Sequence, residues 1–204
     1  MIYDKNIIVC GGSGFIGSNI CRNLLNKRNR IICIDNFYTS KKSNLKDLVN
    51  YKNFKFINKD ITKKINIKAD EIYNFASPAS PVHYQFDPLK TIKVNVIGSL
   101  NLLENAKKYN SKILQASTSE VYGDPLIHPQ SEDYWGNVNP IGIRSCYDEG
   151  KRAAESIFYD FYRQYKTKIK IVRIFNTYGP YMQVNDGRVI SNFVVNALQN
   201  KDIN

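Results

Sequence analysis

Three side chains capable of chemistry lie at fixed intervals in the second half of this 204-residue chain. Tyr147 and Lys151 are four residues apart, about one turn of a helix, so both side chains would point the same way. A phenol has a pKa of about 10. Lowering it to about 7 takes roughly 4 kcal/mol, which a neighbouring ammonium and the positive ring of an oxidised nicotinamide can supply. With Thr118 bonded to the same substrate hydroxyl, the set predicts removal of a proton and a hydride from a secondary alcohol.

A Tyr-x-x-x-Lys spacing also arises where a surface lysine lies beside an aromatic residue, so this prediction depends on the rest of the chain. An apolar run, 7–10, leads directly into a glycine turn, and a helical pattern follows it. The turn has the spacing G-x-x-G-x-x-G, formed by Gly11, Gly14 and Gly17. Strand, glycine turn and helix in this order bring backbone N–H groups and a helix N-terminus to a phosphate.

A second apolar strand, 31–34, ends in Asp35, twenty-one residues after Gly14. A carboxylate in this place accepts hydrogen bonds from the ribose hydroxyls and repels a 2′-phosphate. The sequence therefore predicts a dinucleotide site, with NAD rather than NADP as the cofactor.

Six apolar segments alternate with helical patterns and predict strands at 7–10, 31–34, 54–57, 71–75, 111–117 and 169–175. We expect one α/β domain over residues 1–204, with a Rossmann-type doubly wound parallel sheet, strand order 3-2-1-4-5-6 and helices on both faces. Ligands of such sheets bind at the carboxyl ends of the strands. The candidate residues follow strands, so they should meet at that edge.

The connections between strands carry further predictions. Pro78 and Pro81 exclude a continued strand or helix and predict a rigid loop at the carboxyl edge. Apolar residues recur at helical spacing and predict a long amphipathic helix with one apolar face, formed by Leu89, Ile92, Val96, Leu100, Leu103 and Ala106. The segment 123–145 is long and contains aromatic residues, which favours an ordered active-site loop.

Composition narrows the classes of partner. The formal charge of +11 comes from lysines scattered along the chain, so we interpret it as a compositional bias and predict no nucleic-acid partner. Cys10 and Cys33 lie in apolar strands and indicate buried thiols in a reducing compartment. His83 and His128 are isolated, so we expect surface or loop positions and no metal site. Without a signal peptide or an apolar span, we expect no membrane contact and a cytoplasmic location.

The glycine spacing, together with Thr118, Tyr147 and Lys151, resembles the short-chain dehydrogenase/reductase superfamily. The segments 75–81, 116–139 and 173–176 are similar to UDP-glucuronate decarboxylases (UDP-xylose synthases), which are extended members of that superfamily. This resemblance implies that NAD oxidises UDP-glucuronate at C4, that the 4-keto intermediate loses carbon dioxide, and that the same NADH reduces the ketone to UDP-xylose. It also implies a homodimer formed by the helices after the fourth and fifth strands.

The resemblance also implies roles for single residues. Tyr147 would be the acid/base, Lys151 would lower its pKa and hold the ribose, and Thr118 would orient the C4 oxygen. Glu120 would lie near the sugar carboxylate, where two anions destabilise the charged substrate. The implied cofactor positions are Gly11, Gly14, Phe15, Ile16, Gly17, Asp35, Asn36, Thr39, Asp60, Ile61, Ser77, Tyr147 and Lys151. The implied UDP-sugar positions are Pro78, Lys93, Asn176 and Arg188.

By this resemblance we expect the chain to lack the C-terminal third of these relatives, so 175–204 would be only the start of a sugar-nucleotide-binding region. Three alternatives stay open. A 4,6-dehydratase shares the oxidation step but needs a carboxylic acid where this chain has Ser119. A 4-epimerase shares the same first step, and an NAD-binding fragment without turnover would need neither substrate nor chemistry.

Overall fold

Six parallel strands form one sheet in the computed structural model, which describes residues 3–203. The strands are β1 (Asn6–Cys10), β2 (Arg30–Asp35), β3 (Phe54–Asn58), β4 (Glu71–Asn74), β5 (Lys112–Thr118) and β6 (Ile169–Ile174). Their order is β3-β2-β1-β4-β5-β6, so the predicted doubly wound topology is confirmed. The direction of winding changes between β1 and β4, the place where ligands of such sheets bind.

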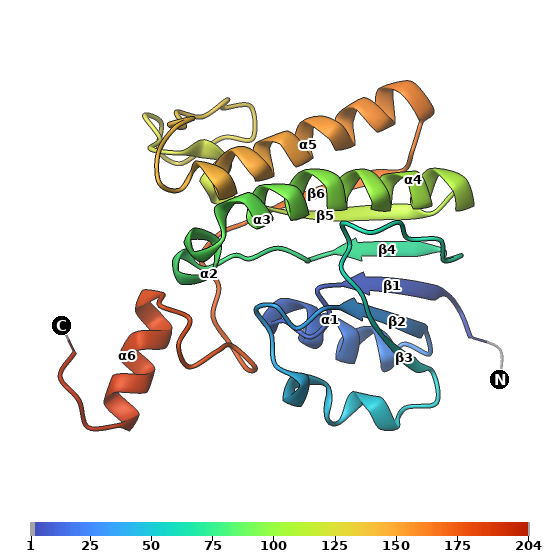
Figure 1. Cartoon of the computed structure of the whole chain (residues 1–204), viewed down its shortest axis with the longest axis horizontal. Coiled ribbons are helices and arrows are strands. Elements are labelled where there is room, and N and C mark those ends of the chain that lie inside the picture. Colours follow the sequence, from blue (N-terminus) through green and yellow to red (C-terminus); the bar gives the residue numbers. More distant parts are fainter. Residues whose placement is uncertain (1–2, 204) are drawn as a thin grey trace.

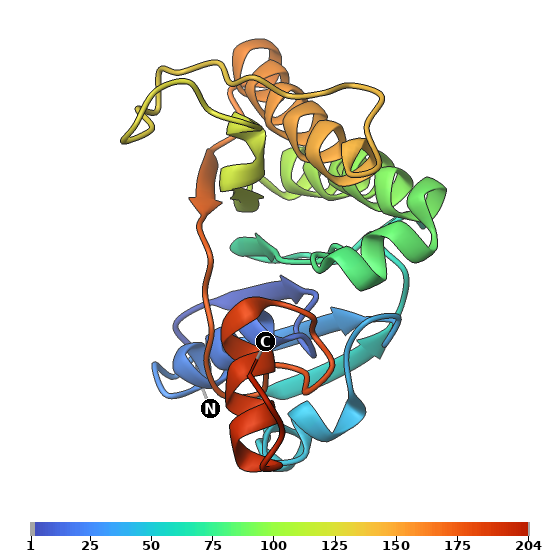
Figure 2. The same cartoon turned by 90° about the vertical axis from the view of Figure 1, so that its left-hand side faces the viewer.

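Alternate residues of the central strands enter separate cores on the two faces of the sheet. Ile7 and Val9 point toward one face, and Ile8 and Cys10 toward the other. The first face is covered by α1 (Phe15–Leu25) and the 3-10 turns η1 (Lys42–Leu45) and η2 (Leu48–Asn50). The second face is covered by α3 (Pro88–Lys93), the π-helical turn η3 (Val94–Gly98), α4 (Ser99–Tyr109) and α5 (Ser145–Tyr165). Figure 2 shows α1, in blue, on one side of the sheet and the green and orange helices on the other.

The predicted helix after β4 exists as the contiguous run α3, η3 and α4. Its predicted apolar face is partly wrong, because Leu89 and Leu100 are exposed while Gly98 and Ser99 are buried. At Gly98 the reason is close packing: a Cβ atom there would lie 2.4 Å from Cδ1 of Ile61. The buried face therefore carries a small residue at this point and larger ones at Val94, Leu102 and Leu103.

Two predictions about loops need correction. Pro81 does not exclude a helix: it is the first residue of α2 (Pro81–Phe86), where a missing N–H is tolerated. The segment 123–145, expected as an active-site loop, is anchored mostly elsewhere, since Arg152 donates to the Trp135 carbonyl (2.7 Å) and Arg173 to the Glu132 carbonyl (3.0 Å). Trp135 itself is 90% exposed. At the end of this loop, Arg144 alone of the loop's described residues lines the main cavity.

After β6 the chain follows the carboxyl edge of the sheet through residues 175–188 and ends in α6 (Val189–Leu198). Figure 1 shows α6 on the side toward which the arrowheads of β1 and β4 point, apart from the helices that cover the sheet. Among the described helices, none combines the length and the apolar character needed to cross a membrane.

Candidate active site

A cavity of about 300 Å³ lies at the carboxyl edge of the sheet. It brings together residues from the glycine turn, from the ends of β4 and β5, from α5 and from the segment after β6. The sequence-predicted residues that line it are Gly11, Gly14, Phe15, Ile16, Gly17, Thr39, Ser77, Thr118, Glu120, Tyr147, Lys151, Asn176 and Arg188.

A smaller cavity of about 70 Å³ adjoins the first, and the two share Gly11, Gly14 and Ser77 as wall residues. Its other predicted residues are Asp35, Asn36, Asp60, Ile61 and Pro78. Pro78, expected near the sugar, therefore lies toward the end where adenosine was expected. Lys93, also expected near the sugar, is exposed on α3 and lines neither cavity.

The glycine turn is compact enough to let a ligand approach the backbone. Gly11 has φ +72°, and a Cβ atom there would lie 2.7 Å from the Ala76 nitrogen. A Cβ atom on Gly17 would lie 2.1 Å from the Gly11 carbonyl oxygen. Helix α1 starts at Phe15 without a side-chain cap, so its first N–H groups are open toward the cavity they line. Such a helix start fits the diphosphate of a dinucleotide.

Asp35 is held in a fixed orientation at the end of β2. Its carboxylate accepts hydrogen bonds from the Ser13 amide (3.0 Å), the Phe37 amide (2.8 Å) and the Ser40 hydroxyl (3.0 Å). Two carboxylate oxygens offer about four acceptor positions, so one remains for a ribose hydroxyl. Open amides beside a fixed carboxylate are the groups that a dinucleotide requires, and the residues present fit one.

The predicted catalytic residues come from β5 and α5. Thr118 ends β5, and its hydroxyl accepts a hydrogen bond from the Glu120 amide (3.2 Å). Tyr147 and Lys151 lie in the first two turns of α5 and are 6% and 3% exposed. The Lys151 ammonium is 5.7 Å from the centre of the Tyr147 ring and donates to the Ala116 carbonyl (2.8 Å). The structure therefore brings the three side chains to one wall of the cavity, as the spacing suggested.

The family model described as GDP-mannose 4,6 dehydratase matches residues 8–203. The chain belongs to the GDP-mannose 4,6-dehydratase family. UDP-glucuronic acid decarboxylase 6 of Arabidopsis thaliana is 54% identical over 197 residues, which are 96% of this chain and 57% of the plant protein. The resemblance to UDP-glucuronate decarboxylases is thus confirmed, and the chain spans little more than half the length of this relative.

Solved structures of nucleotide-sugar enzymes share the fold of this family member. A UDP-N-acetylglucosamine 4-epimerase from Methanobrevibacter ruminantium, in complex with UDP-N-acetylmuramic acid, superposes with a TM-score of 0.88 at 30% identity, over 98% of this chain and 65% of that one. A dTDP-glucose 4,6-dehydratase from Bacillus anthracis, in complex with NAD, has a TM-score of 0.81 at 29% identity, over 97% and 63% of the two chains.

Burial dominates the electrostatics of Tyr147. Burial raises the pKa of Tyr147 to about 12, and the charge of Glu120 acts in the same direction. A hydrogen bond with Thr118 and the charge of Arg188 oppose this rise. Among the protein's own groups, desolvation therefore outweighs the hydrogen bond with Thr118 and the charge of Arg188. The expected fall of this pKa also requires the oxidised nicotinamide, so it stays a prediction. At neutral pH the phenol keeps its proton.

Burial also acts on Lys151 and lowers its pKa to about 8, while the charge of Glu155 partly restores it. The side chain is still mostly protonated at pH 7. Lys151 can therefore still serve as the cation of this site at neutral pH, although a smaller fraction of it is protonated than of an exposed lysine.

Glu120 is not the isolated anion that was expected. Its carboxylate pairs with the guanidinium of Arg144, which lines the same cavity. A sugar carboxylate at this place would therefore face the Glu120–Arg144 ion pair rather than an unpaired carboxylate. In this family member, any anion that enters would meet Arg144 as well as Glu120.

Sequence reasoning missed several residues of this cavity, among them Arg144, Tyr84 and His83. Tyr84 is 1% exposed, and its ring stacks on Tyr147 with centroids 5.0 Å apart and an interplanar angle of 9°. The Tyr84 hydroxyl has no hydrogen-bond partner among the described residues. His83, expected at the surface or in a loop, is half-buried on α2 and bonded to the Ser80 hydroxyl (2.7 Å). The prolines at 78 and 81 were taken to exclude a helix, so His83 and Tyr84 on α2 were not predicted to face the cavity.

A buried ion pair behind the cavity was also missed. Glu155, one turn beyond Lys151 on α5, accepts from the Ser117 hydroxyl (2.5 Å) and pairs with Arg173 of β6 (2.8 Å). The pair links β5, β6 and α5 directly behind Thr118. The i, i+4 spacing of Lys151 and Glu155 was the available signal. Within residues 3–203, no group of three or more His, Cys, Asp or Glu side chains lies close enough to hold a metal ion.

Proposed function

We propose that this chain belongs to an NAD-dependent decarboxylase that converts UDP-glucuronate to UDP-xylose through a 4-keto sugar. The observation that carries the proposal is the meeting of Thr118, Tyr147 and Lys151 on one cavity that continues to the glycine turn. The substrate follows from the relative at 54% identity, whose name is UDP-glucuronic acid decarboxylase 6.

The adjoining cavities support NAD as the cofactor. The open amides at the start of α1 would hold its diphosphate, and Asp35 would hold the adenosine ribose, which disfavours a 2′-phosphate. Asn36 donates to Asp60 (3.0 Å) and keeps that wall of the smaller cavity in place. When bound, NAD would take the two electrons of the C4 oxidation and return them to the ketone.

Proton transfer is assigned to Tyr147. In the protein the phenol is protonated, the state required to donate a proton when the ketone is reduced. Acting as a base on the C4 hydroxyl requires a large fall of its pKa, and the positive charge of the oxidised nicotinamide would join Lys151 and Arg188 in producing it. Thr118 would hold the C4 oxygen in line with the phenol.

The sugar end of the cavity supports an acidic substrate. Asn176 and Arg188 line it from the segment after β6, which we propose is the start of a sugar-nucleotide-binding region. Arg188 is paired with Asp186, and this pairing raises the pKa of Arg188 although burial opposes the rise. Arg144 lies at the same end, within reach of a sugar carboxylate that would compete with Glu120 for it.

A second candidate is a nucleotide-sugar 4,6-dehydratase or 4-epimerase, favoured by the two solved structures of those activities. Ser119 lines the cavity directly after Thr118, and a hydroxyl cannot replace the carboxylic acid that dehydration needs. The decarboxylase therefore remains the better fit. A cytoplasmic location also stays a prediction.

We also propose a homodimer. The outer face of α3, η3 and α4 exposes Leu89 (69%), Ile97 (41%) and Leu100 (38%), and Phe86 at the end of α2 is 85% exposed. An apolar face on helices that already pack on α5 is typical of an interface between subunits.

The test is incubation of the 204-residue chain with NAD and UDP-glucuronate, with carbon dioxide and UDP-sugars measured. UDP-xylose without net NADH supports the proposal. A keto sugar with stoichiometric NADH would show that oxidation occurs without coupled reduction. If NAD binds and no product forms, the chain by itself is a cofactor-binding unit and the proposed activity fails for it.

A further inference from the structure

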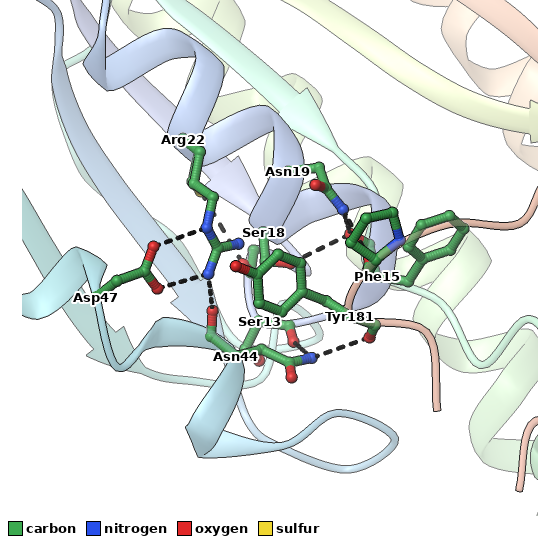
Figure 3. A network of polar contacts seen from close by, with 11 residues as sticks. Ser13, Phe15, Ser18, Asn19, Arg22, Asn44, Asp47 and Tyr181 are labelled. Atoms are coloured by element: carbon green, nitrogen blue, oxygen red, sulfur yellow. Dashed lines mark hydrogen bonds and ion pairs between the residues drawn. The ribbon is translucent and has the colours of Figure 1, made fainter. Parts of the chain in front are cut away.

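The segment Gly179–Gln183, which we call the clasp, crosses from the end of β6 to the opposite half of the molecule. It lies against the glycine turn, the start of α1 and the residues after β2. Figure 3 shows the meeting point, with Tyr181 between Arg22 and Asn44 and with Asn19 beside Phe15. The clasp is separated by more than a hundred residues from the segments it touches.

Side chains of the cofactor half bind the backbone of the clasp. Asn19 donates to the carbonyls of Phe15 (2.9 Å) and Pro180 (3.0 Å), and so joins α1 to the clasp. Asn44 donates to the carbonyls of Ser13 (2.9 Å) and Tyr181 (3.4 Å), and so joins the glycine turn to it. Each amide therefore bridges the two parts.

Arg22 closes the contact. Its guanidinium lies 3.7 Å from the centre of the Tyr181 ring, a close cation–π contact. Two hydrogen bonds to Asp47 (2.8 and 2.6 Å) and one to the Asn44 carbonyl (2.7 Å) hold the guanidinium flat under the ring. Neither Arg22 nor Tyr181 lines the main cavity or the smaller one, so both would act through the residues they hold.

The backbone of the clasp shows that these contacts are strong enough to hold a disfavoured conformation. Tyr181 has φ +71°, in the left-handed region, which costs a non-glycine residue about 1 kcal/mol. Such a conformation persists where surrounding contacts impose it. At this position the stack on Arg22 and the hydrogen bond from Asn44 do so.

One residue of the clasp borders the main cavity. Gln183 lines it together with Gly14, Phe15 and Thr39, and its side chain donates to the Thr39 carbonyl. A diphosphate held at the start of α1 would lie beside Gln183, and Asp35 is joined to the same turn through the Ser13 amide. Release of a dinucleotide would then require the clasp to leave α1.

We propose that the clasp retains the dinucleotide, with Arg22 and Tyr181 as the positioning residues that keep it closed. The proposal rests on the NAD site proposed above. It gives the protein a means to keep a cofactor that is oxidised and reduced within one turnover, because opening the clasp limits the rate of dissociation.

The test is stopped-flow release of NADH from the 204-residue chain, followed by NADH fluorescence after mixing with excess NAD. Tyr181→Gly removes the ring and also relieves the backbone strain, so loss of stability does not obscure the result. We expect its dissociation rate constant to rise about tenfold, with an association rate constant near that of the wild type. Tyr181→Phe keeps the stack and should behave as the wild type.

Two further variants complete the experiment. Arg22→Lys keeps the charge but loses the flat, two-bond pairing with Asp47, and we expect faster release here too. Tyr178→Ala is the matched control, since Tyr178 directly precedes the clasp and is 67% exposed. Unchanged release in Tyr181→Gly and Arg22→Lys would overturn the clasp and leave the NAD site standing. Failure of the wild type to bind NADH would overturn both, and an equal effect of Tyr178→Ala would overturn the assignment to Arg22 and Tyr181.

Discussion

Tyr147 is a buried phenol that keeps its proton at neutral pH, since burial raises its pKa to about 12. Tyr84 stacks on it, and the Tyr84 hydroxyl has no hydrogen-bond partner within residues 3–203. A phenol in this state carries the proton that an oxygen placed beside Thr118 would receive. To act as a base, the phenol must have a lower pKa, and that lowering depends on the cations around it.

Tyr147→Phe is expected to abolish oxidation of UDP-glucuronate at C4, because it removes the hydroxyl that we propose exchanges the proton. NAD affinity should stay within about twofold, since the ring and its stacking are kept. Turnover and equilibrium NADH binding would be measured on the same preparation. A variant that still forms product would remove Tyr147 from its assigned role.

Lys151→Met is expected to stabilise the protein while weakening NAD binding. Burial lowers the pKa of Lys151 from 10.5 to about 8, so the folded state binds its proton less tightly than the unfolded state does. The cost is fully present below pH 8 and fades as the pH rises from 8 to 10.5. We expect Lys151→Met to gain about 1–2 kcal/mol at pH 7, with the lost hydrogen bond to the Ala116 carbonyl limiting the gain.

Urea denaturation of both proteins at pH 7 and pH 10 checks this. The gain of the variant should be smaller at pH 10, and a constant difference between the two pH values would contradict the assignment. The Ala116 carbonyl keeps the Gln115 amide as a donor (3.1 Å), so the substitution leaves no unpaired acceptor there.

At the scale of elements, α5 carries the site. Its first turns present Tyr147 and Lys151, and its next turn presents Glu155, which ties the helix to β5 through Ser117 and to β6 through Arg173. The helix therefore cannot shift along the sheet without breaking a buried ion pair. The distance between Thr118 and Tyr147 is set by this attachment as much as by the strand.

Glu155→Gln is expected to lower the free energy of unfolding by about 2 kcal/mol, because Arg173 loses its charged partner in a partly buried place. It should also lower the pKa of Lys151 further, since Glu155 is the group that raises it. Glu149→Gln, on the same helix with a longer and more exposed pairing to Arg152 (3.7 Å), is the control and should change stability little. Thermal unfolding of the three proteins decides, and equal losses in both variants would contradict the role of Glu155.

At the scale of the whole molecule, the carboxyl edge of the sheet carries both cavities, and the clasp joins the end of β6 to the glycine turn along this edge. Exposed apolar side chains form a face on α2, α3, η3 and α4. The chain spans 57% of the plant relative, so both the assembly and the activity of the whole protein are proposals.

The double substitution Leu89→Glu and Leu100→Glu is expected to convert a dimer into monomers, since two charges would be buried in an apolar interface. Both residues are exposed in the single chain, so its fold should be kept. Val49→Glu, on η2 and 57% exposed, introduces a charge elsewhere and should leave the dimer unchanged. Analytical ultracentrifugation gives the oligomeric state, and a wild-type monomer at micromolar concentration would contradict the proposed face.

The sequence by itself determined the fold class, the strand order and the edge at which candidate residues meet. These follow from local rules: apolar runs predict strands, a glycine turn predicts a phosphate-binding helix start, and the strand order follows from connections that allow few topologies. Tyr147, Lys151 and Thr118 were found because a spacing of four residues and the end of a strand fix directions without knowledge of the fold.

Only the tertiary structure decided the rest, because it depends on distances between residues far apart in the chain. Gly98 of η3 is buried because it packs on Ile61, which no periodicity reveals. Arg144 on Glu120, Tyr84 on Tyr147 and Tyr181 on Arg22 are contacts between separate segments. The pKa of Tyr147 also depends on the depth of burial, a property of the packed molecule, which raises it in the protein without a bound cofactor.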